Sequence, residues 1–406
     1  MEWQVLLGGR LIDGTGREPV EGAAVVIQRD RIQYAGPSAA AEWPADARIR
    51  RVDGHCVMPG LIDCHDHLAH PGLDVARRAE TPPTLAVYET GVSLEQTLRA
   101  GITTVRDAGG LDYGAKLAVE RGLIDGPRLV VTLAILCPTA GLGDPCCPSG
   151  MTFPPAPGIP SGIRNGADDC RLGVREMVAA GASAIKIATT GGVGSRWHGA
   201  LDRQFSDAEV EALVDEAHAW GKRVLSHSHG GAGARAAIRA GVDSLDHGSY
   251  LHQHDDLLRE MAARGIYLVP TLSVVVDHLA MGNPTHRGKA EGILEHCHRT
   301  IQRALELDVR MAMGTDAGAY GHARNAREVQ FLVEAGVSPM KAIVMSTGDA
   351  AECIGLGPEV GRLEAGKYAD LLVVDGDPLA DPGILARQER LAMVVKGGRA
   401  CVDRLS

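Results

Sequence analysis

The sequence VMPGLIDCHDHLAH at residues 57–70 begins as an apolar strand and ends in two histidines, His65 and His67, on either side of Asp66. Because successive side chains of a strand point to opposite faces, both histidines project from the same face. Two imidazoles at a strand end can bind one metal ion. The chain has 16 histidines, so this pattern alone is equally compatible with two hydrogen-bonded histidines, and further ligands decide between the two.

The rest of the chain alternates between strand-like and helix-like segments, the pattern of a parallel sheet with crossover helices. Strands are predicted over residues 57–63, 103–108, 128–136, 184–190, 223–228, 244–247, 267–273 and 310–316. Helices are predicted at residues 93–100, 169–180, 206–220, 255–264 and 286–307. Eight such strands predict an α/β fold, a (β/α)8 TIM barrel with its chemistry at the C-terminal strand ends. The Pro- and Gly-rich segment 137–165 is expected to be a lid or substrate loop.

The two ends of the chain read differently, as short strands broken by turns. Neither end has enough strand to bury a core alone. We therefore expect residues 1–56 and 361–406 to pair into one small β-sandwich. That accessory domain is discontinuous, and the barrel of residues 57–360 is inserted into it.

The composition is that of a soluble globular enzyme, with 45% hydrophobic and 23% charged residues in a chain of 406. The net charge of -10 argues against nucleic acid as a partner, because phosphate binding needs a basic face. The N-terminus has no signal-peptide pattern, and no apolar run reaches the ~20 residues that span a bilayer. Nine cysteines without a C-x-x-C pair favour a reducing, cytoplasmic setting. We expect a small-molecule substrate and neither a nucleic-acid nor a membrane partner.

The fourth predicted strand, AIKIATTGG, carries a lysine, Lys186. Lys186 shares one face with Ala184 and Ala188, and the isoleucines on the other face suit the helix side, so Lys186 is expected to point into the barrel. A bare buried ammonium is costly unless it is paired, and a metal cation would repel it. Reaction with CO2 would give a carbamate whose two oxygens can bridge two metal ions. The alternative is a structural lysine paired with an aspartate such as Asp63 or Asp107.

Later strands end in further potential ligands. The fifth strand ends in VLSHSHG with His227 and His229 on its inward face, the sixth in SLDHG with His247, and the eighth in MAMGTDAG with Asp316. Any one of these could be a satisfied core residue, but groups that close separate barrel strands favour one shared metal site. The expected ligand set is His65, His67, Lys186, His227, His247 and Asp316.

These ligands are nitrogen and oxygen donors without sulfur, which suits Zn2+, with Mn2+, Co2+ or Fe2+ as alternatives. Six ligands with a bridging carbamate, Lys186 as N6-carboxylysine, predict two metal ions about 3.5–4 Å apart. A hydroxide bridging the ions would attack a carbonyl carbon, and Asp316 would take the proton of the nucleophile and deliver it to the leaving group. His229 either stabilises the developing oxyanion or supports a ligand from behind.

Together these motifs resemble the amidohydrolase superfamily over nearly the whole chain. They run from PGLIDCHDH at residues 59–67 through TTVRDAGG at 103–110, AIKI, LSH, DHG and GTD to GRLEAGKYADLLVVD at 361–375. The resemblance implies a metal-dependent hydrolase of carbon–nitrogen bonds. Its ligands would be two histidines of an HxH motif, a carboxylated lysine, two single histidines and an aspartate, which are the six positions named above. It also implies a homo-oligomer.

Within the superfamily the chain is most similar to prolidase-like and imidazolonepropionase-related enzymes. These include dipeptidases that cleave Xaa-Arg, Xaa-Lys and N-acyl amino acids, and hydrolases of xenobiotic amides, carbamates and ureas. The dipeptidases commonly carry Gly-His after the third strand, where this chain has AGLG at residues 140–143, and many relatives have a tyrosine in place of His229. The expected substrate is an amide in a dipeptide or N-acyl amino acid, or an aryl amide or carbamate.

Several side chains on loops near the C-terminal strand ends are candidates for substrate contacts, although each is as compatible with an ordinary surface position. These residues are Tyr113, Trp197, His198, His322 and Arg324. The glycines of residues 191–194 favour a flexible loop over a phosphate cradle, because no lysine follows them.

Other functions are weighed against this one. A lactonase or phosphotriesterase would use a similar ligand set, but that branch usually lacks an N-terminal sandwich. A mononuclear deaminase or imidazolone ring hydrolase generally lacks the lysine of the fourth strand. A barrel kept only as an assembly scaffold would lack ligands. The sequence therefore favours a binuclear metal-dependent amidohydrolase and keeps the first two functions as alternatives.

Overall fold

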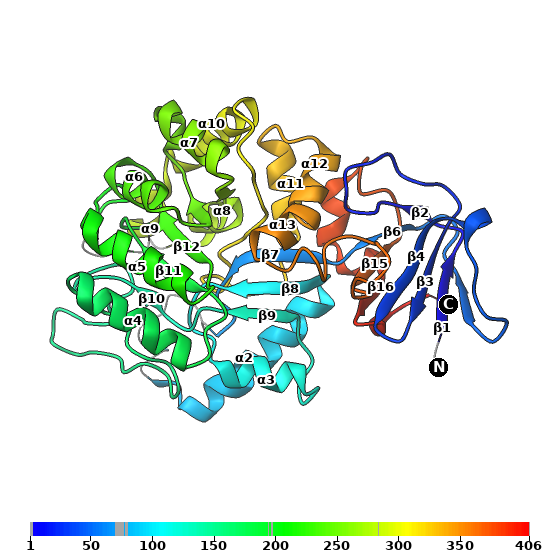
Figure 1. The fold of residues 1–406 in the computed structure, drawn as a ribbon, viewed down its shortest axis with the longest axis horizontal. Coiled ribbons are helices and arrows are strands. Elements are labelled where there is room, and N and C mark those ends of the chain that lie inside the picture. Colours follow the sequence, from blue (N-terminus) through cyan, green and yellow to red (C-terminus); the bar gives the residue numbers. More distant parts are fainter. Residues whose placement is uncertain are drawn as a thin grey trace.

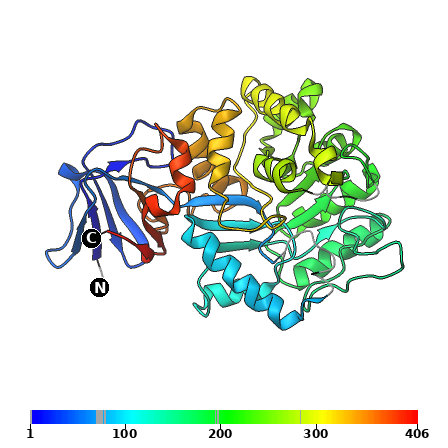
Figure 2. The same ribbon diagram turned by 180° about the vertical axis from the view of Figure 1, so that it is seen from behind.

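The computed structural model describes residues 3–69, 77, 80–193, 195, 198–282 and 284–405. Figure 1 shows a larger part of alternating strands and helices beside a smaller part built of strands, which carries both ends of the chain. Figure 2, seen from behind, shows the N-terminal and C-terminal segments together at that end of the molecule. The protein is therefore α/β, with a barrel-type part and a small β domain.

Two sheets form the small β domain, with strand orders β4-β3-β1-β5 and β17-β16-β15-β6-β2. Their strands are β1 (Trp3–Leu7), β2 (Arg10–Leu11), β3 (Ala23–Gln28), β4 (Arg31–Pro37), β5 (Arg48–Arg51), β6 (Cys56–Pro59), β15 (Leu371–Val374), β16 (Leu391–Lys396) and β17 (Arg399–Asp403). The second sheet joins the chain ends, because β15 pairs antiparallel with both β6 and β16. Apolar side chains of both sheets, such as Val25 and Val373, share one buried cluster.

The strand predicted over residues 57–63 is split at Gly60. Strand β6 belongs to the small domain, and β7 (Leu61–Asp66) begins the barrel-type part. A Cβ at Gly60 would lie 2.1 Å from Oγ1 of Thr103, so glycine lets the chain pass this close to β8 (Ile102–Asp107). The prediction of one strand was wrong because the apolar run continues across the change of sheet.

Parallel strands form the barrel-type part, in two sheets with orders β7-β8-β9 and β10-β11-β12-β13-β14. The further strands are β9 (Arg128–Val131), β10 (Ile135–Leu136), β11 (Ile185–Ala188), β12 (Val224–Ser228), β13 (Ser244–His247) and β14 (Tyr267–Val269). Backbone N–H groups of Ser183 and Ala184 donate to the carbonyl of Val131 (2.7 and 3.3 Å) and connect the two sheets. Because the pairing is parallel, the carboxyl ends of these strands meet at one end.

The eighth predicted strand, residues 310–316, is an irregular segment rather than a named strand. Its backbone still bonds to both neighbouring strands: the N–H of Leu268 donates to the carbonyl of Arg310 (2.9 Å), and the N–H of Cys64 donates to the carbonyl of Met313 (2.9 Å). Asp316 has φ +55°, a conformation that breaks regular strand geometry. The segment therefore lies between β14 and β7 without a continuous ladder to either.

Helices follow the strands along the chain. They are α2 (Pro83–Arg99), α3 (Tyr113–Glu120), α4 (Ala167–Ala179), α5 (Asp207–Ala219), α6 (Gly231–Ala240), α7 (Asp255–Arg264), α8 (Leu272–Met281), α9 (Pro284–Ala290), α10 (Ile293–Glu306), α11 (Arg327–Glu334), α12 (Pro339–Met345) and α13 (Gly348–Cys353). The expected capping box of Ser206 and Glu209 is present at the start of α5. The helix predicted over residues 286–307 is divided at Gly292 (φ +80°), and β14 ends three residues before α8 rather than running to residue 273.

Within the described ranges, no helix is both long and apolar enough to cross a membrane. The interior of the barrel-type part contains two cationic residues, Arg106 and Lys186, among its most completely buried side chains. Both need buried counter-charges. The buried carboxylate of Asp246 lies next to both and supplies the counter-charge.

Candidate metal centre

Seven of the predicted site residues line a single cavity of about 180 Å³ at the C-terminal ends of the strands. They are His65, His67, Lys186, His227, His229, His247 and Asp316. The five histidines come from the last two positions of a strand or from the position just after it, as in other barrels with active sites at this face. Asp316 ends the irregular segment 310–316, and Lys186 reaches the cavity from the second residue of β11. The structure therefore brings together side chains from positions far apart in the sequence.

Strand register sets the heights of the ligands in the cavity. Ala188 of β11 lies opposite His227 of β12, and Ser228 lies opposite His247 of β13. The imidazoles of His227 and His247 consequently approach with ring centroids 4.3 Å apart. A Cβ at Gly192 would lie 3.1 Å from the ring of His227, so the glycine leaves the histidine room to turn inward.

His65, His67 and Asp316 form the opposite side of the cluster. The Nε2 atoms of His65 and His67 lie 3.5 and 3.3 Å from Oδ1 of Asp316. Ligand atoms of His65, Asp316 and His247 all lie within 4.8 Å of one another. Nitrogen and carboxylate atoms at this spacing can surround a divalent ion.

Three residues of the site have a left-handed backbone, although none is glycine. His247 has φ +72°, Thr271 φ +54° and Asp316 φ +55°. This conformation is most unfavourable for a β-branched residue such as Thr271. It turns the hydroxyl of Thr271 to within 2.7 Å of Nδ1 of His247. Backbone strain here coincides with the positions of two expected ligands and one supporting residue.

The outer nitrogens of three histidines have oxygen neighbours. Nδ1 of His67 bonds to the carbonyl of Gly109 (2.8 Å), Nδ1 of His65 lies 3.0 Å from Asp246, and Nδ1 of His247 bonds to Thr271. Such contacts fix the ring and direct Nε2 toward a metal.

Two histidines differ in what their Nε2 atoms contact. Nε2 of His227 bonds to the carbonyl of Gly191 (2.9 Å). Nε2 of His247 is buried and has no hydrogen-bond partner in the part of the chain that the structure describes. An orphaned buried nitrogen of this kind needs a partner, and a metal ion would supply one.

The electrostatics of the cluster also favour a bound cation. Burial raises the pKa of Asp316, but the neighbouring His65 and His67 outweigh burial and hold the pKa well below its usual range. Burial lowers the pKa of His67, but Asp316 outweighs it and raises the pKa to about 9. The partly buried carboxylate of Asp316 thus attracts positive charge to the nitrogens around it, and a metal ion can provide that charge.

Lys186 is buried and bonds to neither of the aspartates considered in the sequence. Its Nζ donates to Oδ2 of Asp246 at 2.6 Å. Burial lowers the pKa of Lys186, and the carboxylate of Asp246 only partly opposes that effect. Asp63 instead accepts a hydrogen bond from the hydroxyl of Thr315 (2.6 Å), and Asp107 accepts one from the N–H of Leu68 (2.8 Å).

His229 lies against the cluster rather than at its centre. Its ring stacks on His247 at 5.0 Å with an interplanar angle of 16°. Nδ1 of His229 bonds to Oγ of Ser249 at 2.9 Å. Burial lowers the pKa of His229 to about 4, so the imidazole is neutral near pH 7.

The remaining wall of the cavity is mainly apolar. Its side chains are Ile135, Leu142, Val193, Val274, Val275 and Ala319. The polar exceptions beyond the cluster are Ser249 and His278, whose Nδ1 bonds to the hydroxyl of Tyr320 at 2.6 Å. The space next to the ligands is therefore suited to an apolar group of a substrate.

The candidate substrate contacts are dispersed. Tyr113 packs against Gly181, where a Cβ would lie 2.6 Å from its ring. His198 bonds to Ser195 (2.7 Å) and to the carbonyl of Ala140, so it ties the loop after β11 to the loop after β10. Trp197 lies outside the described residues.

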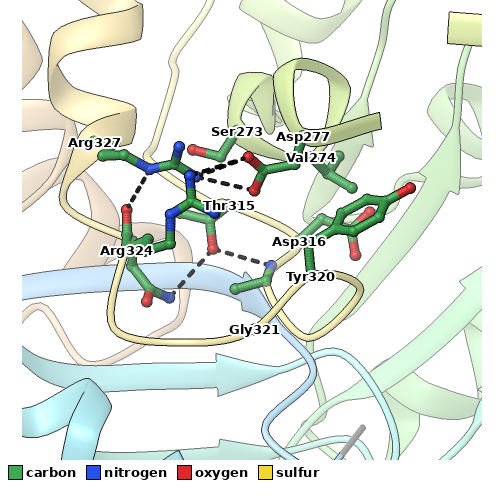
Figure 3. A pocket seen from close by; sticks show the side chains of 11 residues that line it. Ser273, Val274, Asp277, Thr315, Asp316, Tyr320, Gly321, Arg324 and Arg327 are labelled. Atoms are coloured by element: carbon green, nitrogen blue, oxygen red, sulfur yellow. Dashed lines mark hydrogen bonds and ion pairs between the residues drawn. The ribbon is translucent and has the colours of Figure 1, made fainter. Parts of the chain in front are cut away.

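His322 and Arg324 follow the irregular segment 310–317. Nδ1 of His322 lies 3.5 Å from Asp66, away from the cavity. Arg324 lines a cleft of about 10 Å³ next to Asp316, where Figure 3 shows Arg324 and Arg327 directed toward Asp277. Nη2 of Arg327 lies 2.9 and 3.1 Å from the two carboxylate oxygens of Asp277. This cleft has room for about one water molecule.

Comparison with known proteins identifies the family. Residues 56–401 match the model of the amidohydrolase family. The chain belongs to the amidohydrolase family. Members of this family generally use divalent metal ions together with a carboxylated lysine, and this amidohydrolase is a metal-dependent hydrolase that acts on carbon–nitrogen bonds.

Its relatives include proteins named ochratoxinase, imidazolonepropionase and prolidase. Ochratoxinase of Aspergillus niger is 32% identical over 97% of this chain and 86% of that protein. Imidazolonepropionase of Rhizorhabdus wittichii is 30% identical over 89% of this chain and 90% of that protein. A prolidase solved in complex with N-methylphosphonate-L-proline has a TM-score of 0.90 and 31% identity, covering 98% of this chain and 99% of the other. These relatives also indicate a TIM barrel with a small accessory domain.

Sequence reasoning missed several residues of this amidohydrolase that contact the expected ligands or line the cavity beside them. Asp246 precedes His247 and contacts both Lys186 and His65. Its place beside a ligand histidine was the available signal. Thr271 and His278 gave no such signal, because their roles depend on how α8 follows β14.

Proposed function

We propose that this protein is a binuclear amidohydrolase. Two divalent ions would be held by His65, His67, Lys186, His227, His247 and Asp316, with Lys186 as N6-carboxylysine. The expected metal is Zn2+. The observation that carries the proposal is the convergence of all six side chains on one cavity. The orphaned Nε2 of His247 and the anionic Asp316 support a cation at this place.

When bound, the ions would supply an activated water at neutral pH and draw electrons from the carbonyl of the scissile amide. Asp316 accepts the proton of the attacking water through its carboxylate and returns it to the leaving nitrogen. Its position beside His65 and His67 keeps it ionised and ready to accept. Asp316 would thus act both as ligand and as proton carrier.

His229 would donate a hydrogen bond to the developing oxyanion. The thiol of Cys297 donates to Oγ of Ser249 (3.3 Å), which leaves the hydroxyl of Ser249 to donate to Nδ1 of His229. The neutral ring then carries its proton on Nε2 and can act as a donor. The alternative, a purely supporting role, predicts that His229→Gln retains turnover.

The apolar cavity wall supports an amide whose acyl or amine portion is apolar. Relatives named ochratoxinase and prolidase support an amide substrate, and we propose an aryl amide, carbamate, dipeptide or N-acyl amino acid as the substrate class. A lactonase or phosphotriesterase, and a mononuclear deaminase or imidazolone hydrolase, remain the alternatives. The fourth-strand Lys186 argues against the mononuclear enzymes.

The experiment that tests this function combines metal analysis with a substrate screen. Purified protein should contain about two equivalents of zinc per chain. Its kcat/KM should be higher for amides than for lactones or phosphotriesters. Removal of the metal with a chelator should abolish activity, and added Zn2+ should restore it. One equivalent of metal and a deaminated product would instead favour the mononuclear alternative.

We also propose that the strands close into a (β/α)8 barrel, with residues 57–360 as the barrel domain and 1–56 and 361–406 as the accessory domain, except that residues 57–59 of β6 pair within a sheet of the accessory domain. The hydrogen bonds of the irregular segment 310–316 to both β14 and β7 support closure of the barrel.

The exposed apolar side chains Val87 and Tyr88 on α2 (69% and 75% exposed) support a homo-oligomer. Small molecules are the proposed partners, with no role for nucleic acid or membranes. Sedimentation velocity would test the oligomer.

A further inference from the structure

Arg106 and Lys186 enter the barrel interior from different strands and meet at one carboxylate, Asp246. Both side chains are 1% exposed, and that of Asp246 is fully buried. Oδ2 of Asp246 lies 2.6 Å from Nζ of Lys186, and Oδ1 lies 3.4 Å from Nη2 of Arg106. One buried anion therefore faces two buried cations.

Arg106 is held firmly in this position by other contacts. It extends from β8 across the interior to β13, where Nη2 donates to the hydroxyl of Ser244 at 3.0 Å. Its Nε donates to the carbonyl of Cys64 at 2.7 Å. The hydroxyl of Ser244 in turn donates to Oδ1 of Asp246 at 3.2 Å. Arg106 and Ser244 thus both contact Oδ1 of Asp246, the carboxylate oxygen that does not accept from Lys186.

This arrangement has a consequence for Lys186 that rests on the proposed function. In carboxylation, the ammonium of Lys186 first loses one proton to solvent. The neutral amine nitrogen then bonds to the carbon of CO2 as one C=O π bond breaks, and a second proton passes to solvent, which leaves a carbamate with one N–H. The product is an anion, so its former attraction to Asp246 becomes repulsion. A buried carboxylate left without a cation is strongly destabilised, so Asp246 would oppose this reaction if Lys186 were its only cationic partner.

We propose that Arg106 is the positioning residue that makes carboxylation of Lys186 possible. It remains as the cation of Asp246 after Lys186 has changed sign, so neither anion is left unpaired. Asp246 can then keep its place 3.0 Å from Nδ1 of His65 and hold that ligand. Without Arg106, Asp246 would retain Lys186 as its ammonium partner.

The test is a double-substitution cycle read by the CO2 adduct rather than by activity alone. Wild type, Arg106→Met, Asp246→Asn and the double variant are prepared as holoprotein with labelled bicarbonate. Native mass and the carbamate carbon signal give the carboxylated fraction, and zinc analysis gives metal content. Arg128→Met is the control, because Arg128 on β9 also pairs with a buried aspartate, Asp370 (3.2 Å), but in the small domain.

Arg106→Met should lower the carboxylated fraction at least about tenfold, with zinc lost in parallel. The double variant should recover most of the adduct, because removing the charge of Asp246 removes the need for Arg106. Arg128→Met should keep the adduct. A merely structural Arg106 predicts that the double variant is no better than Arg106→Met.

Three other results would count against the role of Arg106 or against the carbamate itself. An Arg106→Met protein that keeps the adduct overturns the proposal. If Arg106→Met does not fold, as judged by circular dichroism, Arg106→Gln replaces it, since the amide keeps hydrogen-bond donors but removes the positive charge and should lower the adduct severalfold; an unchanged adduct there also overturns the proposal. If wild type itself carries no CO2, the carbamate of the proposed function fails instead.

Discussion

Thr271→Val isolates the contribution of one hydroxyl to metal binding. Thr271 accepts a hydrogen bond from Nδ1 of His247 at 2.7 Å when Nε2 faces the metal. Valine keeps the β-branched shape, so the left-handed backbone at φ +54° is equally strained in both proteins. The substitution therefore removes the hydrogen bond and little else.

The size of the effect follows from the surroundings of His247. The residue as a whole is 5% exposed, so water cannot replace the lost acceptor and the Nδ1–H group is left unsatisfied, at a cost of about 1–3 kcal/mol. Loss of a supporting contact of this kind lowers metal affinity about 10–100-fold. The two estimates agree, because tenfold corresponds to about 1.4 kcal/mol. Turnover at saturating Zn2+ should change little.

Competition for zinc against a chromophoric chelator measures this affinity directly. Thr97→Val is the matched control: Thr97 is a buried threonine whose hydroxyl has no hydrogen-bond partner among the described residues. We expect weakened binding for Thr271→Val and unchanged binding for the control. Equal affinity of Thr271→Val and wild type would refute the supporting role of Thr271, and so would an equal loss in both variants.

Three further predictions concern other residues. Lys186→Ala should lose both metal ions and activity, and short-chain carboxylic acids should partly restore both; a zinc content like that of wild type would reject a bridging Lys186. Asp316→Asn should keep most of its metal but lose kcat by about 10²–10⁴-fold, and an unchanged kcat would remove Asp316 from proton transfer. Burial raises the pKa of Glu328 from 4.5 to about 7, so its neutral form is favoured in the folded protein. Stability from this group is present below pH 4.5 and is lost as the pH rises through 7, which amounts to about 3 kcal/mol. The stability advantage of wild type over Glu328→Gln in chemical denaturation should therefore shrink between pH 5 and pH 8, and a constant difference would contradict the raised pKa.

The ligand strands could be predicted because a strand has a side-chain period of two. His65 and His67, and likewise His227 and His229, share a face for that reason alone. Lys186 was directed inward by the same parity and by its small neighbours. Local geometry therefore determined which side chains enter the barrel, without knowledge of the strand order.

Features that depend on contacts between distant segments could not be predicted. Asp246 accepts from Lys186 across 60 positions of sequence, whereas the sequence offered Asp63 and Asp107 as equally reasonable partners. The irregular segment at residues 310–316 was predicted as a strand because its apolar run, Met311 to Met313, gives no sign of the left-handed backbone of Asp316. The split at Gly60 was hidden in the same way, because the glycine is required by Thr103, not by its neighbours in sequence.

The central claim is that one cavity holds two metal ions between these strand ends. Anomalous diffraction from crystals of the zinc-loaded protein, measured at the zinc edge, tests it most directly. Two peaks are expected in the cavity, contacted by the six ligands, with carbamate density joining Lys186 to both. A single peak, or ions bound outside the cavity with Lys186 still bonded to Asp246, would contradict it.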